Sequence, residues 1–191
     1  MNSNRREAVH DQAMELIIEN GLSELTMSKV AGRMGFTEPA MYRHFRNKQD
    51  LVISMIRRLS DCFEEIFQQF DLGEPPNVLL PRYFETLLRY LEEVRGVTLL
   101  FLSESAFNRD PAIREELQKM FRGQIGRITT YLERAAARDE IRPTVDPGAA
   151  ALVFMGTVQA LTTRFLLSSG MAGSRESSRP TLDVFLQGVI G

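Results

Sequence analysis

A short run of polar and aromatic residues has the composition needed to contact DNA. Residues 38–45 read Glu-Pro-Ala-Met-Tyr-Arg-His-Phe, inside a basic stretch of the chain. Arginine can donate two hydrogen bonds to guanine O6 and N7, which discriminates against other bases by about 1–3 kcal/mol. Proline and alanine can contact a thymine methyl group, and lysine, threonine and tyrosine can contact phosphates. This combination indicates nucleic-acid binding.

A helical wheel separates buried from exposed positions in this run. At ~100° per residue, Met41 and Phe45 centre the buried face. Arg43 lies opposite that face and is flanked by Pro39 and Ala40. We therefore predict that these three residues face the base edges.

The remaining polar residues are predicted to contact the backbone or flanking bases. Tyr42 and His44 lie on the shoulders of the wheel, and Glu38 either accepts from a cytosine amino group or supplies a favourable first-turn charge. Threonine and lysine residues near the helix starts are candidate phosphate ligands. The predicted DNA contacts are Thr26, Lys29, Thr37, Glu38, Pro39, Ala40, Tyr42, Arg43, His44 and Lys48.

Three short helices with tight turns must position these residues. Helices are expected over 5–20, 27–34 and 38–45, with Gly35 in the turn between the last two. Thr26 and Thr37 are predicted helix caps, as is Asn47 at the start of a longer helix. Such a helix-turn-helix places its second helix, here 38–45, in the major groove.

The rest of the chain is also predicted to be helical. Apolar residues recur every three or four positions, and no segment alternates with the period of a strand. The sequence predicts an all-α fold of about nine helices, with a Gly/Ser-rich loop over 170–179. The further expected helices span 48–70, 77–94, 97–107, 111–139, 148–168 and 180–190.

Charge and composition narrow the class of protein. The chain of 191 residues has a net charge of −2, but residues 27–58 hold seven basic and two acidic side chains. A basic patch on an acidic body suits a protein that touches nucleic acid at one end. One cysteine excludes a disulfide framework. We find neither a signal peptide nor an apolar run long enough for a membrane span, so a cytoplasmic protein is expected.

No residue pattern indicates catalysis, a metal site or a cofactor. The two histidines do not form a metal-ligand pair, and there is no glycine-rich phosphate loop or nucleophile elbow. An enzyme that only borrows the helix-turn-helix is therefore disfavoured.

The stretch from Leu25 to Leu51 resembles the DNA-binding domain of the TetR family of bacterial repressors. The matching residues are Ala13, Gly21, Leu25, Thr26, Val30, Ala31, Gly35, Tyr42, His44, Phe45, Lys48 and Leu51. The resemblance implies a homodimeric repressor of nine helices that binds a palindromic operator and is released by a small-molecule effector. It implies a DNA-binding domain over 1–60, an effector-binding and dimerisation domain over 61–191, and a fourth helix shared between them that shifts when ligand binds.

The body is rich in phenylalanine, which has two interpretations. The residues line a pocket for an apolar or aromatic effector, or they form an ordinary core. Polar residues inside apolar stretches point to ligand specificity, unless they face solvent or pair between helices. The candidate pocket residues are Phe63, Phe67, Phe84, Leu88, Phe101, Ser105, Phe121, Gln124, Phe154 and Thr157.

Small and apolar residues near the C-terminus suggest a dimer interface. They permit a two-fold four-helix bundle, although burial within one subunit is the alternative. The candidate interface residues are Ala149, Leu152, Gly156, Ala160, Leu182, Phe185, Leu186 and Val189. A protein of the same fold that acts without an inducer, in chromosome organisation or through a protein partner, remains a second functional hypothesis.

Overall fold

The computed structural model describes residues 2–95, 101, 110–168 and 173–190. These residues form eight α-helices and one short 3-10 helix, and no strand occurs among them. The predicted all-α fold is confirmed. The helix expected over 97–107 lies outside the described residues.

The chain divides into two compact units. The first comprises Met1–Leu59 and Val97–Lys119, and the second comprises Ser60–Gly96 and Met120–Gly191. Two helices, α4 (Lys48–Gln68) and α7 (Pro111–Ala136), contribute residues to both units. The described residues 101 and 110–119 thus fall in the first unit, whereas the sequence prediction placed them in the second domain.

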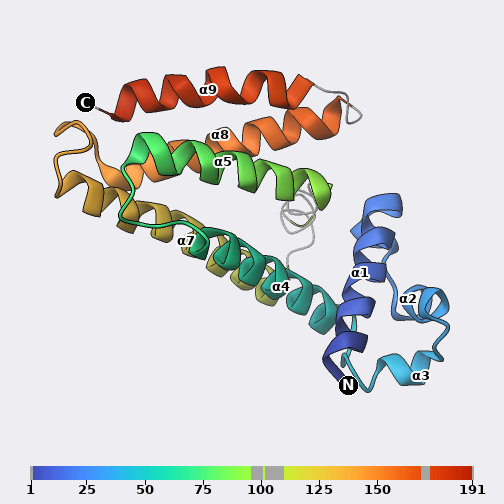
Figure 1. The fold of residues 1–191 in the computed structure, drawn as a ribbon. Helices are drawn as coiled ribbons and strands as arrows, with labels where there is room; N and C mark the ends of the chain where they lie inside the picture. Colours follow the sequence, from blue (N-terminus) through green and yellow to red (C-terminus); the bar gives the residue numbers. More distant parts are fainter. Residues whose placement is uncertain (1, 96–100, 102–109, 169–172, 191) are drawn as a thin grey trace. The chain divides into compact units, whose positions relative to one another are not determined.

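The first unit begins with four helical elements drawn in blue in Figure 1: α1 (Asn2–Asn20), the 3-10 helix (Leu22–Glu24), α2 (Met27–Met34) and α3 (Glu38–Met41). The α1 helix packs against the 3-10 helix and α2, and α2 packs against α3. Their apolar stripes are buried because each helix presents one face to the others. The core side chains include Val9, Ala13, Ile17, Leu25, Val30, Met41 and Phe45.

The start of α4 is fixed by the predicted cap. The Asp50 amide donates to Asn47 Oδ1 at 2.8 Å, and the Asp50 carboxylate accepts from the Arg46 amide at 2.9 Å. This reciprocal arrangement satisfies amides that the first turn of a helix leaves without partners. From there Leu51, Val52 and Met55 enter the core of the first unit.

The second unit contains α5 (Pro76–Glu93), α8 (Pro147–Leu167) and α9 (Gly173–Val189), together with the ends of α4 and α7. Figure 1 shows α8 and α9 lying side by side, and both pack on α5. Aromatic rings hold these helices together. The Tyr83 ring stacks on Phe154 at 5.9 Å and meets Phe67 edge-on at 5.2 Å, while Phe84 and Phe185 each contact Phe154 at 5.5 Å.

The helix α9 begins earlier than predicted. The Gly/Ser-rich segment was expected to be a loop through residue 179, but the chain is helical from Gly173, with Pro180 inside the helix. The expectation followed the low helix propensity of glycine and serine. Propensity is a weak determinant, however, and packing of α9 on α8 and α5 supplies stabilisation that the local sequence lacks.

The helix α8 is apolar on more than its buried face. By length and composition alone it is long and apolar enough to cross a membrane, and 39% of its most apolar window is buried inside the protein. A core helix of a soluble protein has the same composition. The exposed apolar residues Leu152 and Val153, at 59% and 57% exposure, are therefore candidates for contact with another molecule.

His10 links α1 to α4 inside the first unit. The Ser54 hydroxyl donates to the Leu51 carbonyl at 2.7 Å, so it accepts from His10 Nε2 at 2.8 Å. His10 Nδ1 is buried without a hydrogen-bond partner among the described residues. Burial, with the nearby charges of Arg58 and Arg6, lowers the pKa of His10 from 6.5 to about 4.

We predict that His10 makes the first unit sensitive to acid. The unfolded chain takes up this proton near pH 6.5, whereas the folded chain does so near pH 4. The stabilisation is fully present above the unfolded pKa and is lost as pH falls through this window, by up to ~3 kcal/mol. His10→Gln keeps a donor for Ser54 and should flatten the fall in unfolding free energy, measured by urea denaturation from pH 7.5 to 4. His44→Gln is the control, and parallel curves for wild type and His10→Gln would contradict the prediction.

Candidate DNA-binding surface and effector site

The turn between α2 and α3 depends on Gly35. This residue has φ of 66°, a left-handed conformation that glycine adopts at little cost. The Phe36 amide then donates to the Ala31 carbonyl at 2.9 Å, which closes the end of α2. At the other end of α2, Thr26 accepts a hydrogen bond from the Lys29 amide at 3.2 Å, as predicted. Both ends of α2 are thus fixed by local chemistry.

The recognition segment is shorter as a regular helix than predicted. The α3 helix ends at Met41, and hydrogen-bonded turns continue to Phe45, whose amide donates to the Met41 carbonyl at 3.0 Å. Thr37 makes no side-chain cap, contrary to the prediction. Met41 and Phe45 are nevertheless buried as the wheel predicts, because they anchor the segment to the core.

The predicted base-reading side chains lie on the open side of this segment. Glu38, Pro39 and Arg43 are exposed, while Ala40 is half-buried. Tyr42 is 49% exposed, and its hydroxyl donates to Glu38 Oε1 at 3.3 Å. The arrangement can present a guanidinium and a phenol to a groove while two apolar anchors hold the segment in place.

The predicted phosphate ligands already have partners within the protein. Lys48 Nζ donates to the carbonyls of Leu22 and Ser23 at 2.8 and 3.3 Å, which ties the start of α4 to the 3-10 helix. Lys29 pairs with Glu24. Their phosphate contacts stay a prediction, and Lys29 would have to exchange its carboxylate for a phosphate.

The structure adds Arg46 as a candidate phosphate ligand. Its side chain is 88% exposed beside the start of α4 and lies 3.8 Å from Asp50. Sequence reasoning missed it, although a basic residue next to a helix cap is a recognisable signal for phosphate binding. His44, which was predicted, is half-buried.

Most of the predicted effector-pocket residues form the hydrophobic core. Phe63, Phe67, Phe84, Leu88, Phe101, Gln124 and Phe154 are all buried, and Phe121 is half-buried. Phe67 on α4 contacts Tyr83 on α5, and both Tyr83 and Phe84 contact Phe154 on α8. Thr157 instead faces a groove between α8 and α9. Ser105 lies outside the described residues.

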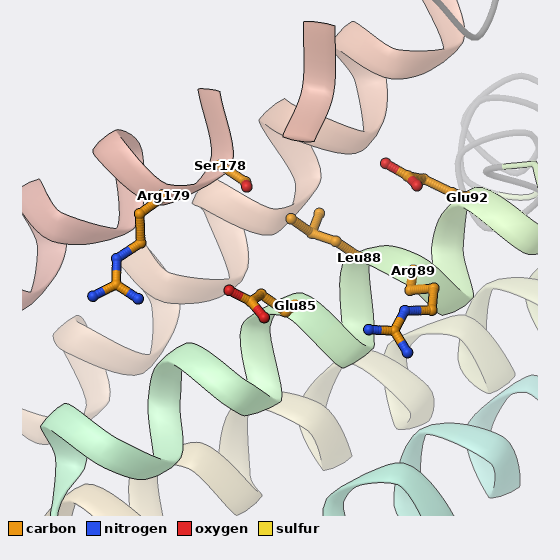
Figure 2. Close-up of a pocket in the computed structure, with 6 residues that line it drawn as sticks. All are labelled: Glu85, Leu88, Arg89, Glu92, Ser178 and Arg179. Carbon is orange, nitrogen blue, oxygen red and sulfur yellow. The ribbon is translucent and has the colours of Figure 1, made fainter. Parts of the chain in front are cut away.

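Two surface cavities of the second unit could hold small molecules. One, of about 290 Å³, lies between α5 and α9. Figure 2 shows Glu85, Leu88 and Glu92 extending from α5 toward the space beside Ser178 and Arg179. The other, here called the α7 groove, has a volume of about 490 Å³ and runs along α7 beside the end of α4; its lining includes Phe67, Leu72, Gly123, Gly126, Arg127 and Tyr131.

The predicted dimer-interface residues separate into two sets. Leu182, Phe185 and Val189 are buried within the subunit, because the apolar stripe of α9 packs on α8 and α5. That these three face a second subunit stays a prediction, and Phe185 also lines the groove between α8 and α9. Leu186 is half-buried, whereas Ala149, Leu152, Gly156 and Ala160 are exposed on α8.

The exposed side of α8 and α9 carries apolar residues that the prediction missed. Val153 and Val184 are 57% and 72% exposed. With Thr157, Pro180, Thr181 and Phe185 they line an α8–α9 groove of about 390 Å³. The all-round apolar composition of α8 was the available signal, since a helix of that kind is covered on every side.

No group of three metal-ligating side chains occurs among the described residues. Cys62 is a free, half-buried thiol.

Two protein-family models match the chain. Residues 10–55 match bacterial regulatory proteins of the tetR family, and residues 80–172 match the tetracyclin repressor-like C-terminal domain. The chain belongs to the TetR family. It is a DNA-binding transcriptional regulator, and the N-terminal match spans α2, the Gly35 turn and α3.

Individual TetR-family relatives are distant but align over most of their length. The chain is 23% identical over 184 residues to the fatty acid metabolism regulator protein of Bacillus subtilis (strain 168), covering 94% of this chain and 92% of that protein. It is 25% identical over 171 residues to the nucleoid occlusion factor SlmA of Vibrio cholerae, covering 86% and 85%. A solved SmeT–triclosan complex shares the fold, with a TM-score of 0.81, 23% identity, and coverage of 97% and 91%.

We predict that Arg43 and Arg46 contribute differently to DNA binding. Arg43→Ala should relax base preference at one position of the site by ~1–3 kcal/mol, because its bidentate base contact is lost. Arg46→Ala should weaken binding to all DNA sequences alike. It should also reduce the slope of log affinity against log salt concentration by about one unit. Fluorescence anisotropy with singly substituted duplexes, at several salt concentrations, measures both effects. A uniform loss of affinity for both variants would contradict the base-reading role of Arg43.

Proposed function

We propose that this TetR-family regulator is a homodimeric repressor that binds a palindromic operator and is released by a small apolar or aromatic effector. The observation that carries the proposal is the exposed face of the 38–45 segment. There Arg43, Tyr42 and Pro39 project from a segment anchored by two buried side chains. The family match covers the whole helix-turn-helix.

The two parts of the chain have different proposed roles. Residues 1–60 bind DNA, with Thr26, Lys29 and Lys48 contacting phosphates and the 38–45 segment reading bases. Residues 61–191 bind the effector and form the dimer. A two-fold dimer presents two identical reading heads, and the symmetry of a palindrome matches it. The protein would act in the cytoplasm, associated with the nucleoid when bound to DNA.

The exposed apolar side of α8 and α9 supports the dimer. Leu152, Val153 and Val184 are large apolar residues that the described part of their own subunit leaves more than half exposed. Gly156 and Ala160 on the same helix are small and exposed, which permits close approach of another helix. A second copy of the chain, related by a two-fold axis, would remove this surface from water.

A second candidate function is chromosome organisation without a small-molecule effector. The relative from Vibrio cholerae is named a nucleoid occlusion factor, and its alignment spans both units of this chain. In that case the same DNA-binding face would act at many dispersed sites, and the cavities of the second unit would serve no effector.

Selection of genomic DNA fragments by the purified protein distinguishes the two functions. Near-physiological salt is needed, since weak electrostatic binding dominates at low salt. A few tight palindromic sites, one of them beside the protein's own gene, are expected for a local repressor. Many scattered sites would contradict the repressor proposal and support the organisational one.

We predict that Val184→Glu disrupts the dimer. Its side chain is 72% exposed, so the subunit should fold normally, but a two-fold interface would bury two carboxylates close together. The dimerisation Kd should rise at least ~10-fold, which corresponds to about 1.4 kcal/mol. Sedimentation equilibrium measures the change, and circular dichroism checks the fold. Val78→Glu, at a 43% exposed position on α5, is the control. An unchanged dimer would contradict the assignment of this face.

A further inference from the structure

Arg127 is a partly buried cation with unused hydrogen-bonding capacity. Its side chain is 21% exposed, and its one ion pair among the described residues joins Nη1 to Glu64 Oε2 at 3.5 Å, at the outer limit for a hydrogen bond. Nε and Nη2 are buried and have no hydrogen-bond partner among the described residues. Buried donors without acceptors are unfavourable, and an ionised group more so. The edge of the guanidinium formed by Nε and Nη2 would therefore be stabilised by a ligand that accepts hydrogen bonds from both atoms.

Arg127 lines the α7 groove, and the rest of this groove suits a ligand with an apolar body. Phe67 and Leu72 form one side of it, and the α7 helix forms the other. Arg122 and Arg134 also line it, and both are exposed. The lining therefore combines apolar surface with three guanidinium groups and contains no carboxylate.

Two glycines open the α7 side of this groove. Glycine is unfavourable inside a helix, yet Gly123 and Gly126 both lie in the interior of α7. A methyl group on Gly126 would meet no atom within 4 Å, so internal packing does not require glycine there. At Gly123 the added carbon would lie 3.5 Å from Arg127 Nη1, so the guanidinium rests over this glycine.

We propose that the α7 groove binds an amphipathic anion. Its carboxylate or phosphate pairs side-on with Arg127, after a rotation that lifts the guanidinium from Gly123, and its apolar body lies along Phe67 and Leu72. The anion replaces Glu64, whose own side chain is 53% exposed and returns readily to water. A bidentate anion is a stronger partner for arginine than a single long contact. This inference rests on the proposed function, because it names the ligand class that the second unit would sense.

Replacement of Glu64 by a ligand anion at Arg127 would change the contacts of α4. Glu64 lies on this helix, which starts at Lys48 in the DNA-binding unit. The Glu64–Arg127 pair links α4 to α7 in the free protein. Replacing Glu64 by a ligand anion removes that link, so binding in the groove changes what restrains the helix shared by the two units.

Alkyl probes of matched chain length test the site. Decanoate and decyl phosphate provide the two anionic head groups, decanol is neutral, and decyltrimethylammonium is cationic. Isothermal titration calorimetry below the micelle concentration, on the full chain without DNA, should show binding of at least one anionic probe, and about tenfold or more weaker binding of the neutral and cationic probes. The stronger of the two anions identifies the head group. Equal binding of all four probes, or of none, would overturn the proposal.

Variants of the groove separate the anion contact from the apolar contact. Arg127→Met should weaken binding of the anionic probe by about tenfold or more and leave the affinity for decanol unchanged. Arg127→Lys should recover part of the lost affinity. Gly126→Leu should block every probe while it improves the helix, and Gly126→Ala should block little. Arg82→Gln removes an exposed guanidinium paired with Glu74 outside the α7 groove and is the matched control. Normal anion binding by Arg127→Met would overturn the assignment of this residue.

The link to DNA is tested on a selected operator fragment. Glu64→Gln, without any probe, should weaken operator binding in the same direction as the anionic probe does on wild type. Probe binding that depends on Arg127 but leaves operator affinity unchanged would overturn the coupling. Failure to select any operator would count against the proposed function itself, and the calorimetric result does not depend on it.

Discussion

The apolar stripe of α4 is the constraint on which both units depend. Leu51, Met55 and Leu59 are buried in the first unit, and Phe63 and Phe67 are buried in the second. A single helix carries all five at four-residue spacing, so its packing is set by two cores at once. Any ligand that changes the packing at one end of this helix acts on an element whose other end begins at the DNA-binding segment.

Local chemistry explains why the N-terminal fold could be predicted from the sequence. The Thr26 cap, the left-handed Gly35 and the Asn47 cap need only residues within four positions of one another, and all three occur as expected. Apart from the Thr37 cap, which does not form, the errors concern where helices begin and end. The α3 helix ends at Met41, and turns lead from it to the buried Phe45, whereas α9, which packs on α8 and α5, extends back to Gly173. Neither contact is visible in local propensity.

For the candidate sites, the spacing of apolar residues predicted which helix faces are buried but not what covers them. An apolar stripe identifies a buried face but does not say whether the covering surface is the same chain or another. Leu182 and Val189 therefore looked like interface residues, although they pack inside the subunit. Phenylalanine spacing likewise cannot separate a ligand pocket from a core, and Phe84 and Phe154 belong to the core. Arg127 is recognisable in the sequence as a polar residue in an apolar stretch, but only the folded chain shows that its Nε and Nη2 lack partners among the described residues.

The Glu64–Arg127 pair is weak, so a ligand anion can replace Glu64 at little cost. For the same reason, loss of this pair alone can change DNA affinity only slightly. An exposed ion pair contributes ~0–1 kcal/mol, whereas a tenfold change in DNA affinity requires about 1.4 kcal/mol. A ligand can shift an equilibrium only by its difference in affinity between the two states. The remaining difference must come from the apolar contacts. Phe67 lies on α4 and lines the α7 groove, so the ligand body would touch directly the helix that its head group releases.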